Sequence, residues 1–368
     1  MGAETTIATG GPAGDLFENP LGTDGFEFVE FTAPEPERLK ALFELMGFTA
    51  VARHRSKDVL RFRQGDINFI LNMEPAGQPA AFRQAHGPSA NAMAFRVKDA
   101  GRALKLAVQR GATAVSGPVG PMELNIPAIE GIGGSNLYLV DRYGAEAIYD
   151  VDFRPLPGAT ARPAGLGLGA IDHLTHNLHR GRMDHWAEFY ERIFNFREIR
   201  TFDIEGQQTG LLSRAMTSPD GKIRIPLNES RDAHSQIEEF LKDYGGEGIQ
   251  HIALSTDDIF GTVEAMRDQG VKFQDTPESY YEGVDARLPG HGESLQRLRA
   301  DRILVDGGPQ DGQGLLLQIF TENMVGPIFF EIIQRKGNEG FGEGNFKALF
   351  ESIELDQVRR GVLPAKGA

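Results

Sequence analysis

The sequence contains no cysteine. This absence excludes disulfide bonds, thiolate nucleophiles and thiolate metal ligands together, and it is typical of proteins in a reducing cytoplasm. Any metal ion must therefore be held by His, Asp or Glu. No apolar run approaches the roughly 18 residues of a transmembrane helix, and the start lacks a basic region followed by an apolar core. We therefore expect a cytoplasmic protein that is not inserted in a membrane.

Positive charge is also in deficit, with 38 Lys and Arg against 52 Asp and Glu and a formal net charge of -14. An acidic protein is repelled by other negatively charged surfaces, so nucleic acid and anionic membranes are not expected as partners. The length of 368 residues predicts about two domains. Residues 1–14 are rich in small residues and are predicted to form a disordered tail.

An internal repeat organises the remainder of the chain. The stretch "GFEFVEFTAPEPERLKALFELMGF" (residues 25–48) resembles "AIDHLTHNLHRGRMDHWAEFYERIFNF" (170–196). Each reads as an alternating strand, an amphipathic helix and a closing Phe, which makes the only Trp a core residue. Further along, "INFILN" matches "IRIPLN" and "AIYDVDF" matches "IFFEIIQ". A stretch rich in Pro, Gly and Ala (156–169) is predicted to link domains 15–155 and 170–368.

Each half is itself doubled. Residues 97–115 and 256–273 again read as a strand end, an amphipathic helix, a glycine stop and a strand start. The sequence thus predicts four βαβββ modules, two in each domain. Each domain is expected to form an open, cupped, barrel-like sheet with helices outside, which is an α+β architecture.

The two halves differ in the residues that could bind a metal ion. The second half has His173, His251 and Glu331 where our alignment of the repeat places Phe28, Ala92 and Asp150 in the first. Alternation along a strand puts His173 and His176 on opposite faces, so only one of them enters the cup. The other histidines are predicted to lie mostly in turns or on solvated helix faces: His54, His86, His176, His179, His185, His234 and His291.

Two imidazoles and one carboxylate fill three of the six positions around an octahedral metal ion and leave the other three vacant. That arrangement suits Fe(II) enzymes that bind substrate and dioxygen at the vacant positions. Zinc held by two His and one Glu is the competing assignment. A zinc hydrolase usually needs a nearby general base, and the sequence has no H-E-x-x-H motif.

At these residues the chain resembles the bacterial 4-hydroxyphenylpyruvate dioxygenase family of the vicinal-oxygen-chelate superfamily. The resemblance covers about residues 15–363. It is carried by the stretches "IDHLTHN", "GRMDHWAEFYERIFNF", "GIQHIA", "LLLQIF", "FFEIIQRKG" and "GFGEGNFKALFESIE".

The resemblance implies that His173, His251 and Glu331 bind one Fe2+ per subunit. It also implies that 4-hydroxyphenylpyruvate chelates this ion through its 2-oxo acid group, and that reaction with O2 gives homogentisate and CO2, a step in tyrosine and phenylalanine catabolism. A homo-oligomer, dimer or tetramer, is implied as well. The family's substrate-binding residues fall on Ser213, Asn228, Gln236, Gln250, Gln318, Phe341, Asn345 and Phe346. Simple alternation turns Gln250 away from the face of His251.

The end of the chain reads as a lid over residues 338–360. Glycines at 337, 340, 342 and 344 precede a segment that becomes amphipathic from Asn345. A glycine-rich hinge followed by a short helix suits a moving lid, and Phe341 and Phe346 are expected to face the phenol ring. The alternative is a C-terminal helix that simply docks on the core.

Other functions stay open on the same fold. 4-Hydroxymandelate synthase shares the triad and the substrate but hydroxylates the benzylic carbon, and Pro226, Asn228 and Phe346 resemble the dioxygenase pattern. An extradiol catechol dioxygenase needs none of the pocket amides. A non-enzymatic ligand-binding protein needs no triad. The first domain offers no site and is expected to serve as scaffold and subunit contact.

Overall fold

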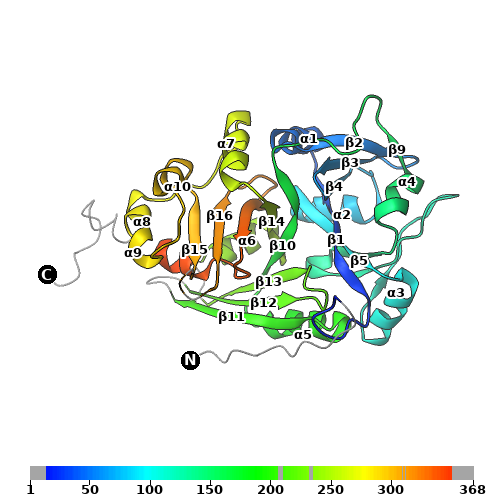
Figure 1. The fold of residues 1–368 in the computed structure, drawn as a ribbon. Coiled ribbons are helices and arrows are strands. Elements are labelled where there is room, and N and C mark those ends of the chain that lie inside the picture. Colours follow the sequence, from blue (N-terminus) through cyan, green and yellow to red (C-terminus); the bar gives the residue numbers. More distant parts are fainter. Residues whose placement is uncertain (1–13, 206–209, 232–234, 309, 311, 350–368) are drawn as a thin grey trace.

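The computed structural model describes residues 14–205, 210–231, 235–308, 310 and 312–349. It forms two curled sheets side by side, each with helices on its outer side (Figure 1). The strands of the first sheet lie between residues 23 and 155, and those of the second between 168 and 336. Residues 1–13 of the predicted tail, His234 and residues 350–360 of the predicted lid lie outside the described residues.

The first half contains two βαβββ modules, as predicted. The first module is β1 (Thr23–Thr32), α1 (Pro36–Leu45), β2 (Thr49–His54), β3 (Val59–Gln64) and β4 (Ile67–Asn72). After α2 (Gly77–His86), the second is β5 (Ser89–Val97), α3 (Ala100–Gln109), β6 (Ala114–Val115), β7 (Ala128–Glu130) and β8 (Asn136–Val140). Two 3-10 turns, η1 (Ile132–Gly134) and η2 (Gly144–Glu146), flank β8, and α4 (Ile148–Asp152) and β9 (Phe153–Pro155) follow. The sheet order is β6-β7-β8-β5-β1-β4-β3-β2-β9.

The second half repeats this plan. Its first module is β10 (Leu168–Leu178), α5 (Met183–Phe194), β11 (Arg197–Glu205), β12 (Gly210–Thr217) and β13 (Arg224–Ser230). After α6 (Gln236–Tyr244) come β14 (Gly248–Thr256), α7 (Ile259–Gln269), β15 (Leu304–Gly307), β16 (Leu315–Phe320) and β17 (Phe329–Lys336). Three short helices precede β15: α8 (Glu278–Glu282), α9 (Val284–Arg287) and α10 (Leu295–Asp301). The sheet order is β11-β12-β13-β10-β14-β17-β16-β15, and residues 343–349 are helical.

Local signals in the sequence account for these elements. Asp99 and Asp258, each at the end of a strand, accept backbone N–H bonds from residues 102 and 261 and so cap α3 and α7. Trp186 lies on the buried face of α5 with 7% of its surface exposed, which confirms it as a core residue. Aromatic rings join the halves, since Phe95 packs edge-on against Phe194 at a centroid distance of 5.4 Å. One continuous apolar core therefore holds both cups in place.

The structure corrects one part of the repeat alignment. Residues 147–153 were expected to form the strand that matches β17, but residues 148–152 form α4. The register identifies the true counterpart, because Ala94 pairs with Tyr138 of β8 as Ala253 pairs with Glu331 of β17. The prediction that the first half keeps a carboxylate at Asp150 is therefore wrong, and Tyr138 occupies that position.

The reason is that α4 fills the first cup. Ile148 and Tyr149 are consecutive and both buried, which a helix allows and a sheet strand with one solvated face does not. They pack on Phe28 and Ile70 from the inner face of the sheet. The apolar content of residues 147–153 thus reflects a plug in the cup, and the first half has no imidazole at the matching positions Phe28 and Ala92.

His176 is a second correction, because it is fully buried and does not lie in a turn or on a solvated surface. It faces away from the cup, as alternation predicts, and its Nε2 lies 2.7 Å from the Tyr190 hydroxyl on α5. Burial lowers the pKa of His176 to about 3. The unfolded chain therefore takes up a proton near pH 6.5 that the folded chain refuses until about pH 3.

Because folded His176 does not take up this proton, acid is predicted to destabilise the folded protein. Because the folded pKa is the lower one, stability falls as the pH drops below about 6.5, by about 2 kcal/mol between pH 7 and pH 5. Phe31 occupies the matching position of the first half, so His176→Phe supplies a ring that the fold accepts and is expected to remove this part of the pH dependence. Urea unfolding of the metal-free protein at both pH values measures it, with exposed His185→Gln as control. An unchanged pH dependence in His176→Phe contradicts the assignment.

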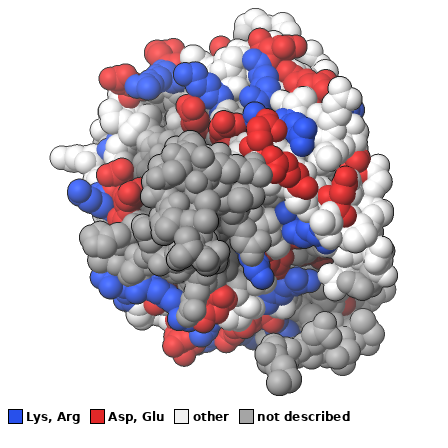
Figure 2. Space-filling view, turned by 90° about the vertical axis from the view of Figure 1, so that its left-hand side faces the viewer, with Lys and Arg blue, Asp and Glu red and all other residues white. Residues whose placement is uncertain are grey.

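Acidic and basic side chains are interspersed over the described residues of the face in Figure 2, without a large patch of either sign. Among the helices of the described residues, none is long and apolar enough to cross a membrane.

Candidate metal centre and substrate pocket

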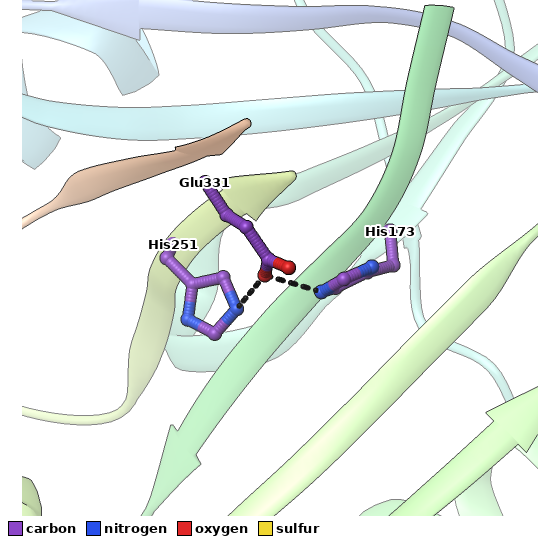
Figure 3. Close-up of side chains that lie close together, drawn as sticks. All are labelled: His173, His251 and Glu331. Atoms are coloured by element: carbon purple, nitrogen blue, oxygen red, sulfur yellow. Dashed lines mark ion pairs between the residues drawn. The ribbon is translucent and has the colours of Figure 1, made fainter. Parts of the chain in front are cut away.

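Three neighbouring strands bring His173, His251 and Glu331 together. β10, β14 and β17 are adjacent in the second sheet, and each points one of these side chains into the cup. The ligand atoms all lie within 4.8 Å of one another, and all three residues are buried. Glu331 Oε2 lies 3.2 Å from His173 Nε2 and 3.4 Å from His251 Nε2, so both imidazoles approach the same oxygen (Figure 3).

The surroundings of the triad fit a divalent metal ion. The other carboxylate oxygen of Glu331 is buried and has no hydrogen-bond partner among the described residues. Each imidazole is held at its far nitrogen, since His173 Nδ1 lies 2.8 Å from Asp172 Oδ1 and His251 Nδ1 lies 2.8 Å from Gln250 Oε1. These acceptors favour the tautomer in which Nε2 carries the lone pair that can bind a metal, although the Thr175 hydroxyl lies 2.9 Å from Nε2 of His251. The structure thus presents two nitrogens and one buried carboxylate, of which one oxygen lacks a partner among the described residues.

The pKa shifts of the three side chains also fit a site for a cation. Burial alone would raise the pKa of Glu331, but the charges and hydrogen bonds of the two imidazoles lower it to about 2. Burial likewise opposes a charged His173, but the Glu331 and Asp172 carboxylates together outweigh burial and raise the pKa of His173. Burial lowers the pKa of His251. A cation bound between the three side chains would compete with protons for the same ligand atoms.

Gln250 reaches this centre although strand alternation turns it away. β14 carries an irregularity here, because Thr175 pairs with His251 and His176 pairs with Ile249, which leaves Gln250 without a partner on β10. The extra residue redirects the side chain, so that Gln250 Oε1 meets the ring of its neighbour His251. The expectation from simple alternation is therefore wrong at this residue.

Polar groups continue along the inner face beyond the triad. Ser213 on β12 pairs in register with Asn228 on β13, and Asn228 pairs with Asn177 on β10. Asn177 is fully buried, and neither atom of its amide has a partner within the described part of the chain. The sequence analysis missed Asn177, although its spacing of two from Thr175 and four from His173 places it on the same face.

The C-terminal segment closes one side of the cup. Gln318 on β16 is 1% exposed, and its Oε1 accepts a hydrogen bond of 3.3 Å from the Asn345 amide. The Tyr280 hydroxyl in turn donates to Asn345 Oδ1 at 2.5 Å. The Phe341 ring stands edge-on to His173 at a centroid distance of 5.4 Å. The structure therefore places Phe341 against His173 and joins Asn345 to Gln318 on β16, two strands from the strand of His251.

Two predicted pocket residues are not buried with the others. Gln236 is exposed at the first position of α6. Phe346 is 37% exposed, whereas Ala348 on the same helical turn is buried in the core. Phe346 was expected to present its face to the substrate, but in this arrangement its ring is partly exposed to solvent.

Comparison with known proteins matches both halves. A family model described as "Hydroxyphenylpyruvate dioxygenase, HPPD, N-terminal" matches residues 17–154, and the Glyoxalase/Bleomycin resistance protein/Dioxygenase superfamily matches residues 170–285. A 4-hydroxyphenylpyruvate dioxygenase from Pseudomonas aeruginosa is 64% identical over 94% of this chain and 97% of its own length. A protein named hemolysin VllY from Vibrio vulnificus is 63% identical over 94% of this chain and 98% of its own.

A solved structure shares the whole fold. A triple mutant of 4-hydroxymandelate synthase from Streptomyces coelicolor superposes with a TM-score of 0.79 at 28% identity, covering 91% of this chain and 99% of its own. Its sequence is far more distant than that of the Pseudomonas aeruginosa protein. The chain thus belongs to the 4-hydroxyphenylpyruvate dioxygenase family.

Proposed function

We infer that this protein is a dioxygenase that converts 4-hydroxyphenylpyruvate and O2 to homogentisate and CO2. The observation that carries this function is a buried His-His-Glu centre, one of whose carboxylate oxygens has no partner among the described residues, in a chain 64% identical to a protein named 4-hydroxyphenylpyruvate dioxygenase. The atoms balance without a further reductant, because both oxygen atoms of O2 are retained in the two products.

We propose that His173, His251 and Glu331 hold one Fe2+ per subunit. A ferrous ion bound there would supply Lewis-acid and redox chemistry to the 2-oxo acid and to O2. The residues around it do the positioning. Asp172 and Gln250 hold the imidazoles so that both Nε2 atoms face Glu331.

The pocket residues are proposed to bind the remainder of the substrate. Ser213, Asn228, Gln318 and Asn345 offer neutral donors and acceptors, which suit a phenol and a carboxylate whose charge the metal already meets. Aromatic rings exclude water, since Phe329 stacks on His251 at a centroid distance of 4.9 Å. Family resemblance also assigns Gln236 and Phe346 to the substrate, although both are exposed in this structure.

Turnover of 4-hydroxyphenylpyruvate tests this function directly. We expect the purified protein, loaded with Fe2+, to consume one O2 per substrate and to give homogentisate as the main product on chromatography. Formation of 4-hydroxymandelate instead would establish the second candidate, which the fold shared with 4-hydroxymandelate synthase favours. A protein that takes up no oxygen and carries zinc would contradict both.

We also propose that the protein acts in the cytoplasm as a homo-oligomer, a dimer or tetramer, with the first domain as scaffold. The lack of cysteine supports the compartment. Family resemblance supports the assembly, which light scattering would measure.

A further inference from the structure

Asp172 lies between a proposed metal ligand and two arginines. Its Oδ1 accepts hydrogen bonds from His173 Nδ1 and from Arg335 Nη2, both at 2.8 Å. Its Oδ2 accepts from Arg335 Nε at 2.8 Å and from Arg224 Nη1 at 3.5 Å. The Asp172 side chain is 6% exposed and that of Arg335 is 13% exposed. This is a two-pronged, largely buried ion pair directly behind the imidazole.

The same guanidinium holds the beginning of the C-terminal segment. Arg335 Nη1 donates to the backbone carbonyls of Asn338 at 3.0 Å and Gly340 at 2.7 Å. The next residue, Phe341, lies under the guanidinium at 5.8 Å and stands edge-on to His173. Contacts therefore link His173 to Asp172, Asp172 to Arg335, and Arg335 to the segment, and Phe341 of the segment contacts His173 in turn.

We propose that Asp172 and Arg335 are positioning residues that couple the orientation of His173 to the closure of residues 338–349 over the cup. The inference rests on the metal-dependent function proposed above. Neither residue is one of the three proposed ligands, so both act through the residues they hold.

The geometry explains why this pair can do both tasks. A guanidinium offers five donors in a rigid fork, and Arg335 uses three of its nitrogens, two on the carboxylate and one on the carbonyls. A carboxylate on the far nitrogen of a ligating imidazole fixes its ring and raises its basicity. Arg224 adds a second link, because it also contacts Glu339 of the same segment. If the segment moves away, Arg335 loses its hydrogen bonds to the carbonyls of Asn338 and Gly340. Arg335 is then held less firmly against Asp172.

The first half supplies a matched control pair. Glu27 precedes Phe28 as Asp172 precedes His173, and the register of the strands places them at equivalent positions. Glu27 Oε2 binds Arg96 Nε at 2.6 Å, and its side chain is 2% exposed. Its carboxylate is as buried as that of Asp172, although Arg96 is 29% exposed against 13% for Arg335, and among the described residues no imidazole and no part of the C-terminal segment is bonded to the pair. Glu27→Gln therefore reports the general cost of losing a buried ion pair.

Hydrogen exchange of the metal-free protein gives a readout that needs no turnover. In Arg335→Gln and Asp172→Asn, we expect the backbone amides of residues 338–349 to exchange at least about 10-fold faster than in the wild type, and to be unchanged within about twofold in Glu27→Gln. Anaerobic titration with Fe2+ is expected to show an affinity about 10- to 100-fold weaker for Asp172→Asn. Unchanged exchange in both variants, or unchanged affinity in Asp172→Asn, would overturn the proposal.

Two further variants separate coupling from simple loss of packing. Arg335→Lys keeps a positive charge opposite Asp172 but not the fork, so we expect Fe2+ affinity within about threefold of wild type while the segment still exchanges fast. The double variant Asp172→Asn/Arg335→Gln should exchange no faster than the worse single variant, whereas additive effects contradict coupling. These readouts are independent of product formation. A wild-type protein that binds Fe2+ but does not turn over 4-hydroxyphenylpyruvate would refute the proposed function alone.

Discussion

Replacing Glu331 with glutamine is expected to abolish turnover, lowering kcat/KM by more than about 10³-fold, because the ion loses its only anionic ligand. Glutamine keeps the shape of the side chain but removes the charge that His173 and His251 approach at 3.2 and 3.4 Å. It also removes the carboxylate that raises the pKa of His173. Iron bound after reconstitution, measured by elemental analysis, should fall far below one ion per chain.

Glu30 provides the control for this substitution. It is a carboxylate buried to 6% exposure in the first cup, where it accepts hydrogen bonds from Asn91 at 2.6 Å and Asn72 at 3.0 Å. Glu30→Gln removes a buried charge of the same kind without touching the triad, so iron content and oxygen uptake should stay at wild-type levels. Stoichiometric iron in Glu331→Gln would refute the assignment of this residue as a ligand.

The repeat in the sequence predicts the two imidazoles of the triad for a physical reason. Residues at equivalent register on equivalent strands face the same cup, so an imidazole that replaces Phe28 or Ala92 must point inward. The same logic predicted the four modules. It failed where it relied on composition alone, since residues 147–153 resemble a strand but residues 148–152 form the helix that fills the first cup.

Other features could not be read from the sequence. The redirected side chain of Gln250 depends on a local irregularity in β14, which leaves no mark in the residue types. Asp172 and Arg335 are separated by 163 positions, and no periodicity relates them. Asn177 follows the alternation of His173, but its missing hydrogen-bond partners emerge only once the surrounding side chains are placed.

Gly342→Ala is expected to lower kcat/KM by about 10²-fold while leaving iron content unchanged, because misplacing a pocket group by an ångström is enough for such a loss. A methyl group at this position would lie 1.8 Å from Gln318 Oε1, so either the buried amide or the C-terminal segment must move. Movement of either breaks the hydrogen bond between Gln318 and Asn345. The triad is untouched, so the effect separates substrate positioning from metal binding.

The backbone at Gly342 has a φ of +77°, so part of any effect of alanine is conformational strain. Gly181 isolates that part, because its φ is +81° and a methyl group there meets no atom within 4 Å. Gly181→Ala should therefore lose stability on the same scale but keep kcat/KM. If both alanine variants retain wild-type kcat/KM, Gln318 does not need its observed position for catalysis. If both lose it equally, backbone strain and not the clash with Gln318 is the cause. Only a loss confined to Gly342→Ala places the C-terminal segment and Gln318 in one substrate-binding unit.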